Sequence, residues 1–320
     1  MERVLDRPAA ATPSLSQRMT GIEWLLLLLL SLVWGGSFFF NRVLVTELRP
    51  FTIVFFRVGL AALALLALLR ITGLRLPRSG ALWRDFFIMG MLNNLIPFGL
   101  IVWGQTQIAS GLAAILNATT PLFAALIVHY SRQDARDRLT GNKLLGVGIG
   151  LAGVVLIVGP ATLSGLGLNL AAQLAVLGAA VSYGFASAFG RRFRATGVPP
   201  LVAATGQVSA SSIMTFPLML IIDRPWELPG LPGPAIWAAM IGLALLSTSL
   251  AYLIYFRLLA GAGAVNVVLV TLLIPPSALL LGALAFAERL DWHELLGMAV
   301  ILAGLVVIDG RVLAAPARRR

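Results

Sequence analysis

Stretches of about 20 apolar residues recur along the whole chain, and they constrain its fold more than any other feature. Hydrophobic residues make up 59% of the 320 residues, and charged residues make up only 12%. A helix of about 20 residues crosses the hydrocarbon core of a bilayer, so the pattern predicts an all-α polytopic membrane protein. Ten transmembrane helices are expected, at approximately 24–45, 51–69, 85–104, 108–130, 144–160, 171–190, 200–222, 234–256, 264–287 and 293–309.

The residue types that are missing exclude several kinds of site. The chain has no cysteine, which excludes disulfides, Fe–S clusters and thiolate zinc sites. Its two histidines, His129 and His293, lie far apart in the sequence. There is no P-loop for direct use of ATP, and no Ser/His/Asp set can be assembled at membrane depth. We therefore expect no metal, no cofactor and no enzymatic activity.

The positive charges follow the loops, and this predicts the orientation in the membrane. The net charge is +11, but the arginines lie in short loops and at the two ends, without a basic helix of the nucleic-acid-binding kind. The loops and tails on one side of ten spans hold nineteen basic residues, and those on the other side hold four. This asymmetry predicts that the N-terminal tail (1–23) and the basic C-terminal tail (311–320) are both cytoplasmic. It also argues against nucleic acid as a partner.

The chain contains an internal repeat. Residues 144–157 and 295–308, at a fixed offset of 151, are identical at 8 of 14 positions. Further pairs keep nearly the same offset: Trp34-Gly35 with Tyr183-Gly184, Pro50 with Pro200, Arg57 with Gln207, and Pro121 with Pro275. The sequence therefore predicts two five-helix units, at 24–160 and 168–310. Because five is odd, the second unit enters the membrane from the opposite side, and such inverted repeats are typical of secondary transporters.

The ordered motifs of the two units resemble one known family. The Trp-Gly-Gly-Ser-Phe sequence at 34–38 is similar to its first-helix signature, and Pro50 followed by Arg57 is similar to its second-helix motif. Pro275 with Glu288 matches its carboxy-terminal repeat pattern. On these residues the chain resembles the EamA family of the drug/metabolite transporter superfamily, of the ten-helix type, over about residues 24–310.

This resemblance implies a fold, an activity and a location. The implied fold is a basket-like bundle with a central cavity. The implied activity is the export of amino acids or related metabolites across the bacterial inner membrane. Within the family the chain most resembles exporters of aromatic amino acids. It departs from the family pattern at Asp134, which stands in an Arg-rich loop where the second unit has Ala287-Glu288-Arg289. This departure puts a shared role for Asp134 and Glu288 in doubt.

Arg57 is the only charged residue well inside a predicted span, and it has two interpretations. A charge at membrane depth is expensive and marks either a functional site or a local structural solution. Arg57 could attract a substrate carboxylate. It could equally snorkel to the interface or donate hydrogen bonds to carbonyls of a neighbouring helix. The neutral Gln207 at the equivalent position of the second unit favours the structural role.

Other polar residues within the spans are candidates for lining the cavity. Asn93 and Pro97 lie on one face of the third span, where the proline frees a backbone carbonyl. The alternative is ordinary hydrogen bonding between helices, worth about 0.6 kcal/mol on average. The polar candidates for substrate binding are Asn93, Asn94, Asn117, Gln207, Asn266 and Thr271.

Aromatic residues and prolines complete the predicted site. Trp34 and Tyr183 occupy equivalent repeat positions, and we expect them to form opposed walls of the cavity. Tryptophans at helix ends are explained by the interfacial aromatic belt. The aromatic candidates are Trp34, Phe38, Trp103, Tyr183, Tyr252 and Tyr255, and the expected hinges are Pro97, Pro121, Pro275 and Pro276.

The leading hypothesis is a secondary exporter that moves a small amphipathic solute by alternating access. A close alternative is a carrier of another metabolite or drug, including a carrier for uptake. A channel or a membrane enzyme is a more distant alternative. The expected partners are a small-molecule substrate and the lipid bilayer.

Overall fold

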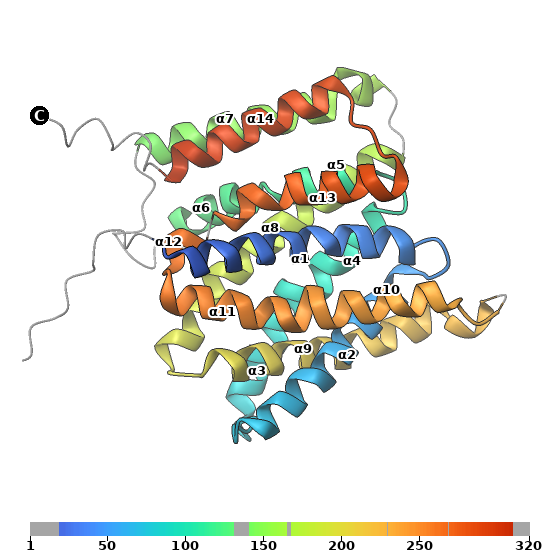
Figure 1. Ribbon diagram of the computed structural model, residues 1–320, viewed down its shortest axis with the longest axis vertical. Helices are drawn as coiled ribbons and strands as arrows, with labels where there is room; N and C mark the ends of the chain where they lie inside the picture. The colour runs from blue at the N-terminus through green and yellow to red at the C-terminus, as the bar shows by residue number, and fades with distance from the viewer. Residues whose placement is uncertain (1–18, 131–140, 165–167, 229, 268, 310–320) are drawn as a thin grey trace, which may run out of the picture.

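The computed structural model describes residues 19–130, 141–164, 168–228, 230–267 and 269–309. Within these ranges every regular element is helical, and there is no β-strand. The first helix begins and the last helix ends at the same end of the bundle (Figure 1). Asp134 and most of the two tails considered above lie outside the described residues.

Most of the helices are long and apolar enough to cross a membrane. Seven candidate spans occur within the described residues: Gly21–Leu44, Pro50–Ile71, Gly80–Gly104, Ser110–Ile127, Asn169–Phe193, Pro200–Glu227 and Pro234–Gly261. Three shorter apolar stretches lie at Leu144–Leu156, Val270–Phe286 and Trp292–Ile308, where the remaining three spans were predicted. The all-α polytopic membrane fold predicted from the sequence is therefore confirmed.

Several spans are divided into consecutive helical segments. The elements up to the second predicted unit are α1 (Gly21–Leu44), α2 (Pro50–Ile71), α3 (Gly80–Gly90), η1 (Met91–Leu95), α4 (Ile96–Gly104), α5 (Ser110–Asn117), α6 (Thr120–Tyr130) and α7 (Gly141–Ser164). They are followed by α8 (Leu168–Ala195), α9 (Pro200–Leu218), η3 (Met219–Asp223), η4 (Pro225–Glu227), α10 (Pro234–Ala244), η5 (Leu245–Leu250), α11 (Ala251–Gly261), α12 (Ala264–Val267), α13 (Val270–Phe286) and α14 (Trp292–Asp309).

Local sequence signals fix where the helices begin. Thr20 caps α1 in a reciprocal capping box, in which the Glu23 amide donates to Thr20 Oγ1 at 3.3 Å and the Thr20 amide donates to Glu23 Oε2 at 2.8 Å. Pro50, Pro200 and Pro234 stand in the first turns of α2, α9 and α10. Proline suits this position because its fixed φ is helical and its missing N–H would have no intrahelical partner.

Glycine contacts hold α7 and α14 together as an antiparallel pair. A Cβ built at Gly146 would lie 2.7 Å from the Gly304 carbonyl oxygen, and one built at Gly153 would lie 2.8 Å from the Gly297 carbonyl oxygen. Higher numbers on one helix meet lower numbers on the other, so the two helices run in opposite directions. They lie side by side along one edge of the bundle (Figure 1). Small residues permit this close backbone approach within a membrane.

The helices α2 and α9 form a second antiparallel pair. Thr52 meets Asp223 near one end, the Phe55 and Phe216 rings lie 5.4 Å apart, and a Cβ at Gly59 would lie 3.3 Å from Ser212 Oγ. As the residue numbers rise along α2, the numbers of the residues they contact fall, so the two helices run in opposite directions. The direction of each helix is thus fixed by its packing partner.

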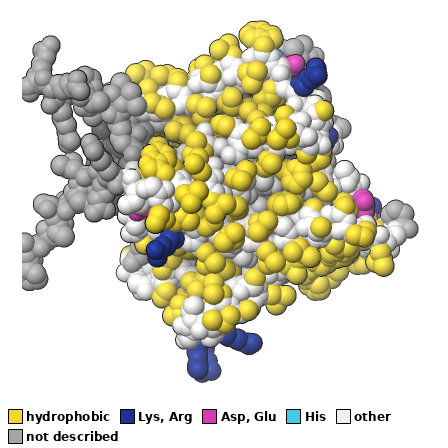
Figure 2. Space-filling view, viewed as in Figure 1, with side chains coloured by type: hydrophobic (Ala, Val, Ile, Leu, Met, Phe, Trp, Pro, Cys, Tyr) yellow, Lys and Arg dark blue, Asp and Glu magenta, His cyan; other side chains and the backbone are white. Residues whose placement is uncertain are grey.

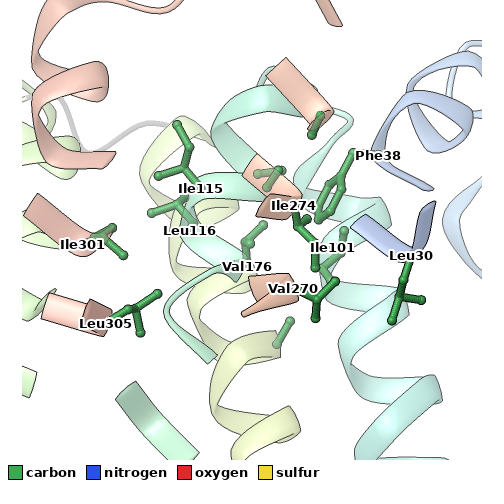
Figure 3. Close-up of a cluster of buried hydrophobic side chains, with 14 of the residues drawn as sticks. Leu30, Phe38, Ile101, Ile115, Leu116, Val176, Val270, Ile274, Ile301 and Leu305 are labelled. Atoms are coloured by element: carbon green, nitrogen blue, oxygen red, sulfur yellow. The ribbon is translucent and has the colours of Figure 1, made fainter. Parts of the chain in front are cut away.

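The largest buried apolar cluster lies between the helices of both predicted units. Its side chains include Leu30 and Phe38 from α1, Ile115 from α5, Val176 from α8 and Ile274 from α13 (Figure 3). Outside the bundle, hydrophobic side chains cover the middle of the visible face, and charged side chains lie toward its edges (Figure 2). This distribution suits a surface that faces lipid around its middle and water at its ends.

We expect Gly153→Val to lower the free energy of unfolding by about 1–3 kcal/mol, because the new side chain has no room against the backbone of α14. The matched control is Gly148→Val on the same helix, where an added Cβ meets nothing within 4 Å. Unfolding of the detergent-solubilised protein followed by circular dichroism measures both effects. Equal stability of the two variants would contradict this packing interpretation.

Candidate functional site

Two π-helical segments interrupt the helices near the middle of two candidate spans. The segment η1 lies within Gly80–Gly104, and η5 lies within Pro234–Gly261. Pro97, in the first turn of α4, has no N–H to donate to the carbonyl of Asn93 in η1, four residues earlier, so the regular hydrogen-bond pattern fails there. In η5, Thr248 Oγ1 donates to the Leu243 carbonyl at 3.1 Å. Such wide turns are frequent at functional sites.

A hydrogen-bonded network of side chains joins η1 to α9 and α11. Asn93 Nδ2 donates to Gln207 Oε1 at 3.3 Å and to Tyr252 Oη at 3.2 Å. The Tyr252 hydroxyl donates to Asn94 Oδ1 at 3.2 Å, and Asn94 Nδ2 donates to Ser211 Oγ at 2.9 Å. The Ser211 hydroxyl donates to the Gln207 backbone carbonyl at 2.7 Å. Asn94, Gln207 and Ser211 are buried, and we call these five residues the amide network.

The Arg57 side chain lies beside this network and is only 5% exposed. Its Nε donates to Thr248 Oγ1 at 3.0 Å, and its guanidinium carbon lies 3.6 Å from the centroid of the Phe98 ring. Tyr183 and Tyr252 are within electrostatic range of the guanidinium. Among the described residues, no carboxylate lies within ion-pair distance of Arg57.

The aromatic candidates are divided between this site and its surroundings. Trp34 packs against Tyr255, with ring centroids 5.8 Å apart, and Tyr183 lies near Arg57. Trp34 and Tyr183 both pack against the large apolar cluster. Phe38 is 3% exposed and points into that cluster (Figure 3). Trp103 is 38% exposed near the end of α4.

The remaining polar candidates lie on α5, α12 and α13. Asn117 ends α5, half-buried, and its Oδ1 has no hydrogen-bond partner within the described part of the chain. Asn266 is buried on α12, and its Nδ2 donates to the Ala262 carbonyl at 2.8 Å. Thr271 is half-buried at the start of α13. The structure therefore gathers Asn93, Asn94, Gln207 and Tyr252 around one centre and leaves these three residues outside the amide network.

The prolines proposed as hinges have two kinds of position. Pro97 and Pro121 stand in the first turns of α4 and α6, where each follows an interruption of its span. Pro275 and Pro276 lie inside α13. A helix tolerates proline in its first turn, as at Pro97 and Pro121. Inside a helix, as at Pro275 and Pro276, proline removes a backbone hydrogen bond.

A buried aspartate at one end of the bundle was not anticipated from the sequence. Asp223, at the end of η3, is 3% exposed, and its Oδ2 accepts from the Thr52 amide at 2.6 Å and from Thr52 Oγ1 at 2.9 Å. It thereby caps the first turn of α2, where a negative charge is favoured by the free N–H groups. Arg49 Nη1 donates to the Asp223 carbonyl at 2.7 Å. The available signal was an acidic residue that ends an apolar run.

Glu288 forms an equivalent contact with the first turn of α5. Its carboxylate accepts from the Ser110 amide at 3.1 Å and from Ser110 Oγ at 2.5 Å. Arg42 Nε lies 3.7 Å from Glu288 Oε1. Like the contact of Asp223, this contact joins an early helix to a late one. The loops that follow α1 and α13 lie at the same end of the bundle, opposite the start of α1 (Figure 1).

The site offers binding groups. Its side chains are a guanidinium, carboxamides, hydroxyls and aromatic rings held near the middle of apolar helices. No group of three or more His, Cys, Asp or Glu side chains that could hold a metal ion occurs in the described ranges. The arrangement is suited to recognising a small polar or amphipathic solute at membrane depth.

Comparisons with known proteins match the chain along nearly its full length. The model of a family described as the EamA-like transporter family matches residues 21–159 and again residues 170–309. An uncharacterized transporter of Bacillus subtilis, YoaV, is 24% identical over 278 residues, covering 86% of this chain and 92% of the relative. An uncharacterized inner membrane transporter of Escherichia coli K12, YedA, is 27% identical over 285 residues, covering 87% and 88%.

A further relative and a solved structure agree with this result. The protein PecM of Dickeya dadantii is 26% identical over 280 residues, covering 87% of this chain and 89% of the relative. One solved structure, described only as "Crystal structure of protein", superposes on this chain with a TM-score of 0.65 and is 19% identical to it in sequence. It covers 92% of this chain and 99% of the other, and at this identity it supports the fold alone.

We expect Tyr252→Phe and Asn94→Ala to be energetically coupled, because the Tyr252 hydroxyl donates directly to Asn94. A double-mutant cycle of unfolding free energies should give a coupling of about 0.6–1.7 kcal/mol, the range of hydrogen bonds between membrane helices. The control cycle pairs Tyr252→Phe with Thr46→Ala, whose hydroxyl bonds only locally to the Val43 carbonyl at 2.6 Å. If both cycles are additive, the hydrogen bond contributes nothing to stability.

Proposed function

The chain belongs to the EamA-like transporter family, and from this premise we propose that it is a secondary transporter that exports amino acids and related small metabolites by alternating access. Aromatic amino acids are the solutes proposed first, because Tyr183 and Tyr255 are within electrostatic range of the polar centre and Trp34 packs against Tyr255. The proposed place of action is the bacterial inner membrane. The proposed activity is transport without chemical conversion of the solute.

The observation that carries the proposal is the polar centre formed by Arg57 and the amide network. Its groups come from α2, η1, α9, η5 and α11, and therefore from both segments that match the family model. Polar side chains at membrane depth are expensive unless they pair with one another or face a wet cavity. A centre that recruits them from both halves of the chain is suited to a solute bound between those halves.

We propose that ten helices form two inverted repeats of five, at 24–160 and 168–310, around this centre. The packing of α7 against α14 supports this arrangement. At the repeat offset of 151, Gly146 corresponds to Gly297, and Gly153 corresponds to Gly304. A two-fold operation would convert the contact of Gly146 with Gly304 into the contact of Gly297 with Gly153. Both contacts are present, with Cβ-to-carbonyl distances of 2.7 Å and 2.8 Å.

A second pair of glycine contacts supports the same two-fold relation. A Cβ at Gly35 on α1 would lie 3.0 Å from the Ala278 amide nitrogen on α13. A Cβ at Gly184 on α8 would lie 3.1 Å from the Ala124 amide nitrogen on α6. The offset between Gly35 and Gly184 is 149, and the offset between Ala124 and Ala278 is 154. Two contacts of the same kind thus recur where an inverted repeat requires them.

The proposed orientation places both termini in the cytoplasm. It rests on the excess of basic residues in one set of loops. The beginning of α1 and the end of α14 lie at one end of the bundle, in keeping with this topology (Figure 1). The contacts of Asp223 and Glu288 then lie at the opposite, external end.

In this proposal the two carboxylates hold the external end closed. Each caps a helix of the first repeat from a position in the second repeat. When that end opens, the N–H groups at the start of α2 and α5 lose the carboxylates and bind water instead. Breaking the carboxylate contacts is an energy barrier to opening, but the N–H groups keep a hydrogen-bond partner in the open state. The prolines Pro97, Pro121, Pro275 and Pro276 supply the points at which the helices can bend.

We expect saturable counterflow of labelled amino acids by the purified protein in proteoliposomes. A carrier with one central site exchanges labelled for unlabelled solute and saturates, whereas a channel gives flux that does not saturate. A panel of labelled amino acids with phenylalanine, tyrosine and tryptophan included measures this directly, and protein-free liposomes are the control. Saturable counterflow of non-amino-acid solutes alone would replace the proposed substrate class, and non-saturating flux would overturn the carrier mechanism.

We expect a disulfide between Ser110→Cys and Gly282→Cys to stop transport reversibly. A Cβ built at Gly282 lies 3.0 Å from Ser110 Oγ, within the reach of a disulfide. The native chain has no cysteine, so the introduced pair contains the only thiols. Oxidation should abolish counterflow, and dithiothreitol should restore it.

Each single-cysteine variant, oxidised in the same way, is the control for this experiment. Maleimide labelling of the remaining thiols measures how much of the double variant is cross-linked. Undiminished counterflow by fully cross-linked protein would mean that α5 and α13 do not separate at this end during transport.

A further inference from the structure

The guanidinium of Arg57 is held rigidly but is only partly satisfied. An arginine side chain carries five N–H donors and stays protonated in proteins. Nε donates to Thr248, and the flat face lies on the Phe98 ring. Within the described residues, neither Nη atom donates a hydrogen bond to any acceptor, and no carboxylate lies within 4.0 Å of the guanidinium. The two nitrogen atoms at the outer edge of the fork are therefore left for another partner.

The hydrogen-bond partners of Arg57 are themselves fixed in place. Thr248 Oγ1 in η5, which accepts from Arg57, also donates to the Leu243 carbonyl near the end of α10. Phe98 is 6% exposed in the apolar cluster that includes Val54 and Val58 of α2. One edge and one face of the guanidinium are thereby occupied. This pre-organises the remaining edge for a planar acceptor.

The equivalent position in the second half of the chain gives an internal comparison. Gln207 corresponds to Arg57 at an offset of 150, and Tyr252 corresponds to Phe98 at the offset of 154 that also relates Pro121 to Pro275. Gln207 is neutral, and its Oε1 accepts from Asn93 within the amide network. The two equivalent positions thus differ in charge. Gln207 is neutral, whereas Arg57 carries a buried positive charge without a counter-ion among the described residues.

A carboxylate is the partner that this edge fits best. A carboxylate accepts two parallel hydrogen bonds from the guanidinium fork and supplies the missing negative charge. Such charge-assisted bonds are stronger at low local dielectric, as in the middle of a membrane protein. The side chains of Tyr183 and Tyr252 lie within electrostatic range of the same charge.

We propose that the outer edge of Arg57 is the subsite that binds the carboxylate of the transported solute. This inference rests on the proposed transport function and names the chemical class of its substrate. The bound solute is an organic acid or amino acid whose carboxylate pairs with Arg57. The rest of the solute extends toward the aromatic rings and the neutral amide network. The charge of Arg57 is thereby compensated during transport by the solute itself.

The test compares acids with their neutral amides. Counterflow of labelled L-phenylalanine is inhibited with unlabelled L-phenylalanine or L-phenylalaninamide, and with 3-phenylpropionate or 3-phenylpropionamide. In the native protein each acid should inhibit at a concentration at least about tenfold lower than its amide, as one charge-assisted hydrogen bond accounts for a factor of this size. Arg57→Gln should bring the ratio close to one, and Arg57→Lys should keep part of it.

The control variant is Arg70→Gln, at the exposed end of the same helix α2. It should leave the acid-to-amide ratio unchanged. The ratio distinguishes a binding role from a structural one, because a purely structural Arg57 changes stability or overall rate without changing the preference for acids. If Arg57→Gln does not fold, the ratio in the native protein and in Arg57→Lys still decides the question.

Binding without transport is measured separately, by thermal unfolding of the detergent-purified protein in the presence of the same four compounds. A failure of counterflow together with stabilisation by the acids only would overturn the proposed amino-acid transport and retain the carboxylate subsite. Equal inhibition and equal stabilisation by acids and amides would overturn the subsite, whatever the outcome for transport. Absence of stabilisation and of inhibition by both acids would also overturn it for this class of solute.

Discussion

In the hydrocarbon core of a membrane no water is present to satisfy a polar group, so each donor and acceptor must find its partner within the protein. This constraint explains why every regular element among the described residues is a helix. It also explains why the interruptions of the helices are so well compensated. At η5 the hydroxyl of Thr248 donates to the Leu243 carbonyl at 3.1 Å, and at η1 the hydroxyl of Ser182 donates to the Leu92 carbonyl at 2.7 Å. Side-chain hydroxyls thus add hydrogen bonds to backbone carbonyls at both π-helical turns.

Against this background the polar centre has two different parts. The amide network consists of neutral groups that satisfy one another across η1, α9 and α11, so it stabilises the bundle in the absence of a solute. Arg57 is compensated only by a hydroxyl and an aromatic face. The first part holds the two halves of the bundle in register. In the second part, the Nη atoms of Arg57, which donate to no acceptor among the described residues, are free to bind a negatively charged solute.

The ends of the bundle are stabilised in another way. Asp223 and Glu288 each place a carboxylate at the first turn of a helix, where free N–H groups and the helix dipole favour negative charge. In the proposed mechanism these contacts lie at the external end, where water replaces them when the helices move. Glycine contacts such as those between α7 and α14 are different, since their close backbone packing leaves no room for small adjustments. The contrast separates helices suited to act as a scaffold from helix ends suited to move.

The membrane class, the helical fold and the transporter family could be predicted from the sequence, because apolar length and ordered motifs are local properties that need no knowledge of neighbours. The sequence also selected Arg57, Asn93, Asn94, Gln207 and Tyr252, since polar residues in apolar spans are conspicuous. Which of these residues meet depends on how the helices pack, and the sequence pattern does not give that packing. A helical period of 3.6 residues tells which face a side chain occupies, but it does not tell which helix lies opposite that face. For the same reason Thr248, Ser211 and Phe98 became partners of the site only when η5, α9 and α4 were packed around α2 and η1. The contacts of Asp223 and Glu288 likewise join residues more than 170 positions apart, a distance over which sequence pattern carries no information about pairing.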